Sequence, residues 1–167
     1  MAPEDATTAL AHGEYRADVA RRGAGLRLLE RSGRALTETW PAGEKPPLSA
    51  GLVLAPWPNR TRDGEFPFGG ATHRLEITEP ARNNASHGLV RRRDWDVVER
   101  TASSVTHAVE VGGEPGWPFP LRLTVRHALA DDGLTVTHTA TNLGDPAAPF
   151  GLGVHAFARA GDAPLDE

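Results

Sequence analysis

The stretch LRLTVRHALADDGLTVTHTATN, residues 121–142, decides the fold class of this chain. In its first half, Leu121, Leu123 and Val125 alternate with polar residues, and the second half repeats the alternation. A period of two is typical of a strand that buries one face and exposes the other. The residues Asp-Asp-Gly at 131–133 separate the two halves and favour a tight turn. The stretch therefore predicts two antiparallel strands joined as a hairpin.

The same pattern extends to other parts of the chain. SVTHAVEV at residues 104–111 also alternates, and Gly69-Gly70 separates two short runs that predict a second hairpin. A helical period is not convincing anywhere, and residues 19–40, interrupted by three glycines, are interpreted as two or three short strands. Segments 41–50 and 77–88 are rich in Pro or in Ala and Asn, which predicts long loops. The sequence therefore indicates an all-β, antiparallel fold with loops available to build a site.

Composition limits the classes of function. The 167 residues suit one domain over residues 1–167 or part of a larger one, and the 18 glycines and 14 prolines indicate many turns. A net charge of -4 argues against nucleic-acid or anionic-membrane partners, and the lack of cysteine excludes disulfides and thiolate sites. Residues 1–20 lack a signal-peptide pattern and no long apolar run follows, so we expect a cytoplasmic protein.

Two histidines are the main candidates for acid–base chemistry. His87 follows NNAS and precedes Gly88, a glycine that allows a tight turn or a close approach to a ligand. The alternative is a loop histidine without a task. His155 shares a predicted strand face with Gly151 and Gly153, which leave space that a ligand could fill. The alternative there is a bulge with a solvated histidine.

Two loops carry groups that suit a sugar. APWPNR ends in Asn59 and Arg60, whose several donors match hydroxyls or carboxylates, although a rigid capped turn is the structural alternative. GWPFP carries Trp117, and aromatic faces often line sugar sites but are more often part of a core.

The remaining histidines and the arginine run are interpreted as structural. The histidines at predicted strand positions are His107, His127 and His138. No HxH or HExxH spacing occurs, so a metal site is not expected. The arginines at 91–93 are expected to form a solvated face, with one of them paired to Asp94 or Asp96.

Four segments taken together resemble the aldose 1-epimerases, or galactose mutarotases. They lie between about residues 51 and 157 and read GLVLAPWPNRTRDGEFPFGGATHRLEITEP, NNASHGLVRRRDW, GWPFPLRLTVRHAL and GLTVTHTATNLGDPAAPFGLGVHAF. The resemblance implies a large antiparallel β-sandwich, the galactose mutarotase-like supersandwich, of which this chain holds a part. It also implies interconversion of the α and β anomers of hexoses such as glucose and galactose. Opening a cyclic hemiacetal needs a placed acid and a placed base, and no cofactor or metal.

The resemblance also implies roles for individual residues. His155 matches the histidine that protonates the ring oxygen, and His87 matches a histidine that contacts the sugar near that oxygen. Asn59 and Arg60 match a pair that binds sugar hydroxyls. Ala156 stands where the family usually has proline after its acid. The family's general base is a glutamate that follows the segment resembled here, so we expect little or no mutarotase activity from this chain alone.

Two alternatives remain open at this stage. One is a non-catalytic sugar-binding module of the same fold, and the other is a hexose-6-phosphate 1-epimerase, which needs an extra basic contact. An incomplete sandwich would also leave strand edges unpaired, which predicts self-association or aggregation.

Overall fold

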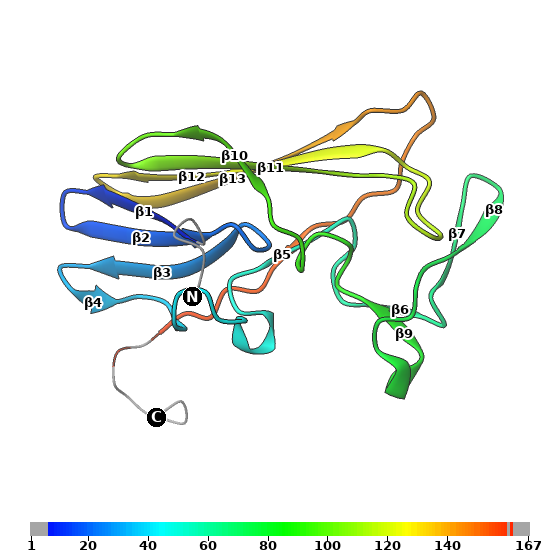
Figure 1. The fold of residues 1–167 in the computed structure, drawn as a ribbon, viewed down its shortest axis with the longest axis horizontal. Coiled ribbons are helices and arrows are strands. Elements are labelled where there is room, and N and C mark those ends of the chain that lie inside the picture. The colour runs from blue at the N-terminus through cyan, green and yellow to red at the C-terminus, as the bar shows by residue number, and fades with distance from the viewer. Residues whose placement is uncertain (1–6, 160, 162–167) are drawn as a thin grey trace.

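The computed structural model describes residues 7–159 and 161, and nearly all of its regular structure is antiparallel strand (Figure 1). The elements are β1 (Thr7–His12), β2 (Tyr15–Ala20), β3 (Gly25–Arg31), β4 (Arg34–Ala35), the 3₁₀ helix η1 (Pro47–Ser49), β5 (Val53–Leu54), β6 (Arg60–Arg62), β7 (Glu65–Phe68), β8 (Ala71–Arg74), the 3₁₀ helix η2 (Pro80–Arg82), β9 (Asn84–Ser86), β10 (Asp96–Arg100), β11 (Ser104–Val111), β12 (Leu121–Ala130), β13 (Gly133–Asn142) and β14 (Gly153–Val154).

Both predicted hairpins are present. β12 and β13 pair along their whole lengths, and Ala130 opposite Gly133 closes the turn. β7 and β8 pair in the same way, with Phe68 opposite Ala71 across the two glycines. Residues 19–40 form the end of β2, then β3 and β4, which agrees with the prediction of short strands.

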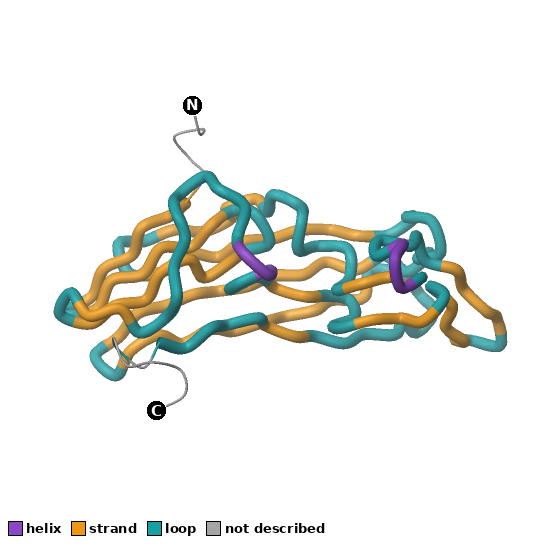
Figure 2. The backbone as a smooth tube through the Cα atoms, turned by 90° about the horizontal axis from the view of Figure 1, so that it is seen from below, coloured by secondary structure: helices purple, strands orange, loops and turns teal. Residues whose placement is uncertain are grey.

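Two meandering sheets make up most of the molecule. β1-β2-β3-β4 form one sheet and β10-β11-β12-β13 form the other, and the strands run along the long axis (Figures 1 and 2). Apolar residues from both sheets meet in one core cluster, whose members are Leu10, Ala17, Val19, Val105 and Leu129. β12 buries alternate residues, and the strands of both sheets pair antiparallel, so the all-β antiparallel prediction is confirmed.

A second core cluster lies beneath the loops. It contains Trp95, Val125 and Trp117, and Trp117 packs against Trp57 and Phe66 with ring centroids 5.5 and 5.7 Å apart. Trp57 belongs to the loop before β6, and Phe66 belongs to β7. These aromatic contacts hold the short pairs β6–β9 and β7–β8, which lie at the end of the molecule away from the N-terminal sheet (Figure 1).

The three predicted structural histidines do occupy strands, and they share the inner face of their sheet. His107 and His138 flank Val125 on neighbouring strands, and His127 lies two positions further along β12. His107 is 0% exposed and His127 is 3% exposed. Neither ring nitrogen of His107 has a hydrogen-bond partner among the described residues, so this histidine fills the core as an uncharged ring.

One of the two predicted long loops needs correction. Residues 77–88 contain η2 and the strand β9, which pairs with β6, whereas a loop was predicted. Three small or polar residues are too few to show a period of two, so the sequence pattern could not reveal β9. In 41–50 the loop is confirmed apart from the single turn η1. In the described residues, no helix is long and apolar enough to span a membrane.

Candidate functional site

The loop before β6 places the first pair of predicted site residues. Asn59 has a positive φ of 60°, a conformation that asparagine tolerates better than most residues. Arg60 then begins β6, where it pairs with Ser86 of β9. The chain turns at Asn59 so that Arg60 enters the ladder while the Asn59 side chain stays at its end.

His87 lies directly opposite Asn59, one step beyond the same ladder. The His87 backbone N–H donates to the Asn59 carbonyl at 2.7 Å, and the Asn59 backbone N–H donates to His87 Nδ1 at 3.1 Å. His87 also has a positive φ of 60°, which is uncommon for a residue with a side chain. The two residues therefore hold each other in place through reciprocal hydrogen bonds.

Position 88 requires glycine, because the chain there lies against the backbone of Ala55. Its φ is +70°, and a Cβ atom there would lie 2.0 Å from the Ala55 carbonyl oxygen. The next residue, Leu89, donates its N–H to that oxygen at 2.8 Å. The sequence suggested that Gly88 allows either a tight turn or a close approach to a ligand. In the structure, Gly88 lets the His87 loop pack tightly onto the loop before β6.

His155 follows β14, which pairs with β5. Its N–H donates to the Leu52 carbonyl at 3.2 Å, and its carbonyl accepts the Gly51 N–H at 2.7 Å. These two bonds fix the backbone of His155 against the segment that leads into β5. The ring of Phe157 packs against the imidazole with centroids 5.0 Å apart.

The space expected above the two glycines near His155 is partly filled. A Cβ at Gly153 would lie 2.8 Å from Pro58 Cβ, and one at Gly151 would lie 3.1 Å from Pro58 Cδ. The glycines therefore admit Pro58, and this contact brings the loop that ends in Asn59 beside β14. Of the space that a ligand could have filled, Pro58 takes a part, and Gly153 also lines the neighbouring cavity.

Four of the five predicted site residues meet at one cavity of about 620 Å³. Its lining residues are Leu48, Leu54, Pro58, Asn59, Arg60, His87, Gly153, Val154, His155 and Phe157. The His87 and His155 rings lie 6.2 Å apart and nearly perpendicular. Ligand sites typically enclose about 300–1,000 Å³ and combine apolar walls with a few polar groups, so this cavity has the size and character of a small-molecule site.

Trp117 is not part of this cavity. Only 2% of it is exposed, and it packs within the aromatic core described above. The structure therefore places Trp117 under the site loops, as support, and not in the lining.

Glu79 holds the guanidinium group of Arg60. Arg60 Nε and Nη2 donate to the two Glu79 carboxylate oxygens at 2.5 and 3.0 Å, and Arg60 Nη1 donates to Asn59 Oδ1 at 3.2 Å. The hydrogen bonds from Arg60 lower the pKa of Glu79 to about 2, so the pair is charged throughout the neutral range. Sequence reasoning missed Glu79, because its contact with Arg60 spans 19 residues and depends on the unpredicted β6–β9 pairing.

Burial and neighbouring positive charge make His87 a weak base. Burial lowers its pKa first, and Arg91, Arg60 and His155 lower it further, while Glu79 acts in the opposite direction. His87 is therefore neutral near pH 7. His155 Nδ1 is buried and has no hydrogen-bond partner among the described residues.

The arginine run lies beside the site but is paired differently from the prediction. Arg93 forms its ion pair with Glu114, and Asp96 lies near Arg21, so the expected pairing within this segment is wrong. Arg91 donates to the hydroxyl of Ser49. The partners come from distant strands and loops, which local spacing cannot indicate.

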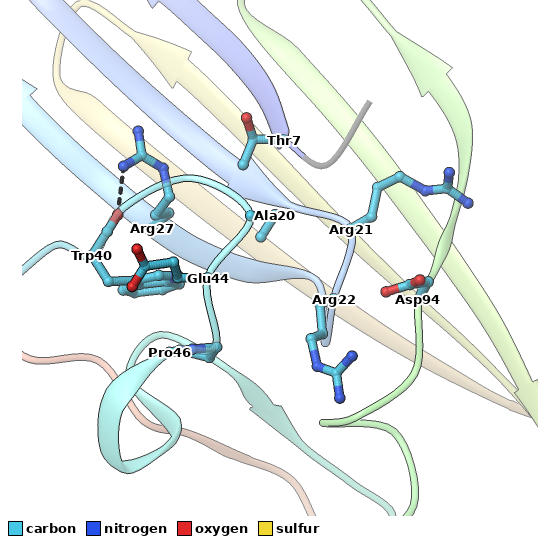
Figure 3. Close-up of a pocket in the computed structure, with 10 residues that line it drawn as sticks. Thr7, Ala20, Arg21, Arg22, Arg27, Trp40, Glu44, Pro46 and Asp94 are labelled. Carbon is cyan, nitrogen blue, oxygen red and sulfur yellow. Dashed lines mark hydrogen bonds between the residues drawn. The ribbon is translucent and has the colours of Figure 1, made fainter. Parts of the chain in front are cut away.

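A second hollow of about 220 Å³ lies between the ends of β2 and β3 and the loop around Trp40. Figure 3 shows that the guanidinium groups of Arg21, Arg22 and Arg27 point in different directions there. Arg27 is held by Asp18 and by the Trp40 carbonyl. The three cations therefore do not converge on one point. The described residues also contain no group of three His, Cys, Asp or Glu side chains that could hold a metal ion.

The antiparallel sandwich has the fold of solved proteins described as aldose epimerases. The GalM/aldose epimerase homologue from C. elegans has the same fold, with a TM-score of 0.78 and 21% identity over 92% of this chain and 50% of that one. The galactose 1-epimerase from Lactobacillus acidophilus aligns with a TM-score of 0.75 and 19% identity, covering 90% and 47% of the two chains. These likenesses show the fold alone.

The chain belongs to the aldose 1-epimerase family, whose sequence model matches residues 7–162. It is 38% identical over 162 residues to the uncharacterized protein YihR of Escherichia coli K12, which covers 96% of this chain and 53% of that protein. The chain thus spans about half the length of the relatives that it matches.

Proposed function

We propose that the cavity binds an aldohexose and supplies the acid side of its anomer interconversion. The observation that carries this proposal is the meeting of Asn59, Arg60, His87 and His155 at one cavity in a chain of this family. In the reaction the ring oxygen gains a proton while the anomeric hydroxyl loses one, which opens the ring. Rotation about one bond and closure on the other face give the second anomer. A placed acid and a placed base are sufficient for this chemistry.

Each residue has a role that its chemistry supports. His155 donates the proton to the ring oxygen, because imidazole exchanges protons near neutral pH. His87 hydrogen-bonds to the sugar beside it. The two ring centroids lie 6.2 Å apart, so both imidazoles are close enough to contact the same sugar molecule. Asn59 and Arg60 bind hydroxyl groups at the adjoining wall.

The described residues bring no Asp or Glu to the cavity lining. A base that removes the anomeric proton is therefore not present in this part of the site. We expect the chain to bind sugar with little or no acceleration of anomer exchange. The same observation favours a second candidate function, a sugar-binding role without catalysis.

A hexose 6-phosphate is less well matched. Among the described lining residues, Arg60 is the only Arg or Lys, and Glu79 already pairs with it. A phosphate would need a further cation, since its charge is best held by guanidinium or ammonium groups.

Two measurements on the same preparation test the proposal. Calorimetric titration with D-glucose and D-galactose is expected to give saturable binding heat that His155→Ala and Arg60→Ala weaken. Polarimetry of freshly dissolved α-D-glucose is expected to show a rate close to that of buffer. Absence of binding for every hexose would overturn the proposal, whereas a fast rate lost in His155→Ala would overturn only the expectation of weak exchange.

A further inference from the structure

The hydrogen bond to His87 Nδ1 determines where this histidine carries its proton. The donor is the backbone N–H of Asn59, at 3.1 Å, and a backbone N–H cannot accept. Nδ1 must therefore be the unprotonated nitrogen of the ring. Since a neutral imidazole has one proton, that proton lies on Nε2.

The amide oxygen and nitrogen of the Asn59 side chain are assigned from donors and acceptors in the same way. Arg60 Nη1 only donates, so the Asn59 atom 3.2 Å away is the amide oxygen. The guanidinium that orients it is fixed in turn by two hydrogen bonds to Glu79. Four residues thus form one continuous chain of directed contacts that begins at a carboxylate outside the cavity lining and ends at an imidazole within it.

We propose that Glu79 is a positioning residue of the sugar site: through Arg60 and Asn59 it holds His87 in the neutral tautomer protonated on Nε2. The role of this tautomer in sugar chemistry rests on the proposed function, but the tautomer itself is present without sugar. Glu79 acts at a distance because it fixes the guanidinium of Arg60, which bonds the side chain of Asn59, and the backbone N–H of Asn59 donates to His87 Nδ1.

The two histidines therefore have different roles in the proposed site. His87 presents an N–H that neither moves nor ionises near neutral pH, because protonating Nδ1 would break its bond to Asn59. His155 is under no such restraint, since no described residue hydrogen-bonds its buried Nδ1. One ring therefore orients the sugar oxygen by donation, and the other is available to transfer the proton.

Nuclear magnetic resonance of ¹⁵N-labelled imidazole groups tests the tautomer directly, with no sugar present. In the wild-type chain, His87 is expected to favour the Nε2-protonated form about tenfold or more, as one hydrogen bond of this kind supports. In Glu79→Gln the preference is expected to fall, and in Glu79→Ala it is expected to fall further. Glu76→Gln, which removes an exposed carboxylate three residues earlier, is the matched control and should leave the tautomer unchanged.

Arg60→Lys provides an independent variant, because lysine keeps the charge but cannot bind Glu79 and Asn59 in the same geometry. It should reproduce the Glu79→Ala result even where a Glu79 variant folds poorly. A wild-type His87 protonated on Nδ1 would overturn the proposal. So would a tautomer preference that survives both Glu79→Ala and Arg60→Lys. A later titration with D-galactose separates this from the proposed function, since failure to bind sugar leaves the tautomer result standing.

Discussion

The imidazole rings of His87 and His155 lie nearly perpendicular, at an interplanar angle of 85°, although the two residues are 68 positions apart in the sequence. They approach from different pairs of strands, β6–β9 on one side and β14–β5 on the other. Pro58, seated against Gly153, joins the two sides. The site is therefore an interface between two short ladders, and its geometry depends on how closely they pack.

Gly88→Ala should strongly destabilise the chain. The methyl group would enter the space 2.0 Å from the Ala55 carbonyl oxygen, and φ is positive as well. The strained φ angle at residue 88 and the displacement of the Ala55 backbone should together lower the free energy of unfolding by about 3 kcal/mol or more, which urea denaturation measures. Gly69→Ala is the matched control, because φ there is +62° but no atom lies within 4 Å of the added carbon. Its cost should be about 1 kcal/mol, and equal losses in both variants would contradict the steric argument.

Stability should fall as the solution is acidified below about pH 6.5. Burial lowers the pKa of His107 to about 4 and that of His127 to about 3, with Arg21 adding to the first shift and His107 and His138 to the second. Above pH 6.5 both rings are neutral in either state. Below pH 6.5 the two histidines bind protons in the unfolded chain but stay neutral in the folded chain. This difference lowers the free energy of unfolding by about 2 kcal/mol for each histidine at pH 5.

Urea denaturation between pH 5 and pH 8 measures this effect. His107→Leu, which places an apolar side chain in the same core position, should make the slope of stability against pH shallower. His12→Gln is the control, since His12 lies partly exposed near Asp131. If the slope is the same in wild type and in His107→Leu, the buried histidine is not its source.

His155→Gln should separate binding from proton transfer. Glutamine keeps a donor near the sugar but cannot act as an acid at neutral pH, so sugar affinity should change by no more than about tenfold while any residual anomer exchange disappears. Saturation-transfer NMR between the two anomers measures exchange, and calorimetry measures affinity. Exchange that persists unchanged in His155→Gln would assign the acid role to another group.

β13 should promote association between copies of the chain. It pairs with β12 on one side and with no described strand on the other, which leaves a ten-residue edge with unpaired backbone groups. Sedimentation velocity over a range of concentrations should show reversible association. The double variant Thr137→Lys and Thr139→Lys, at two exposed positions of this edge, should weaken it by charge repulsion. A wild-type chain that stays monomeric at every concentration would contradict this expectation.

The sheets were predictable because their information is local. In the hairpin between Leu121 and Asn142, apolar and polar residues alternate on both sides of the turn at Asp131-Asp132-Gly133. The turn then fixes the register of the two strands. β9 escaped prediction because Asn84–Ser86 is too short for any period to appear. Short strands of this kind take their structure from tertiary pairing, and the sequence around them does not indicate the partner.

The site was predictable in its members and not in its arrangement. His87, His155, Asn59 and Arg60 stood out by residue type, neighbouring glycine and family resemblance, and the structure brings them to one cavity. Glu79 carries no such signal, since a carboxylate before proline is ordinary in a loop. The contact of Gly151 and Gly153 with Pro58 was not predictable, because a glycine that makes room for a ligand and one that makes room for a proline ring look the same in sequence.

The ladder that carries Asn59 and His87 contains only three residue pairs, whereas β12 and β13 share ten. Opening so short a ladder breaks few backbone pairs, so we expect it to require less free energy than unfolding the sandwich. We therefore expect the cavity to open and close while both large sheets stay folded. If the cavity binds a sugar as proposed, a sugar that contacts both histidines should shift this local equilibrium toward the closed ladder.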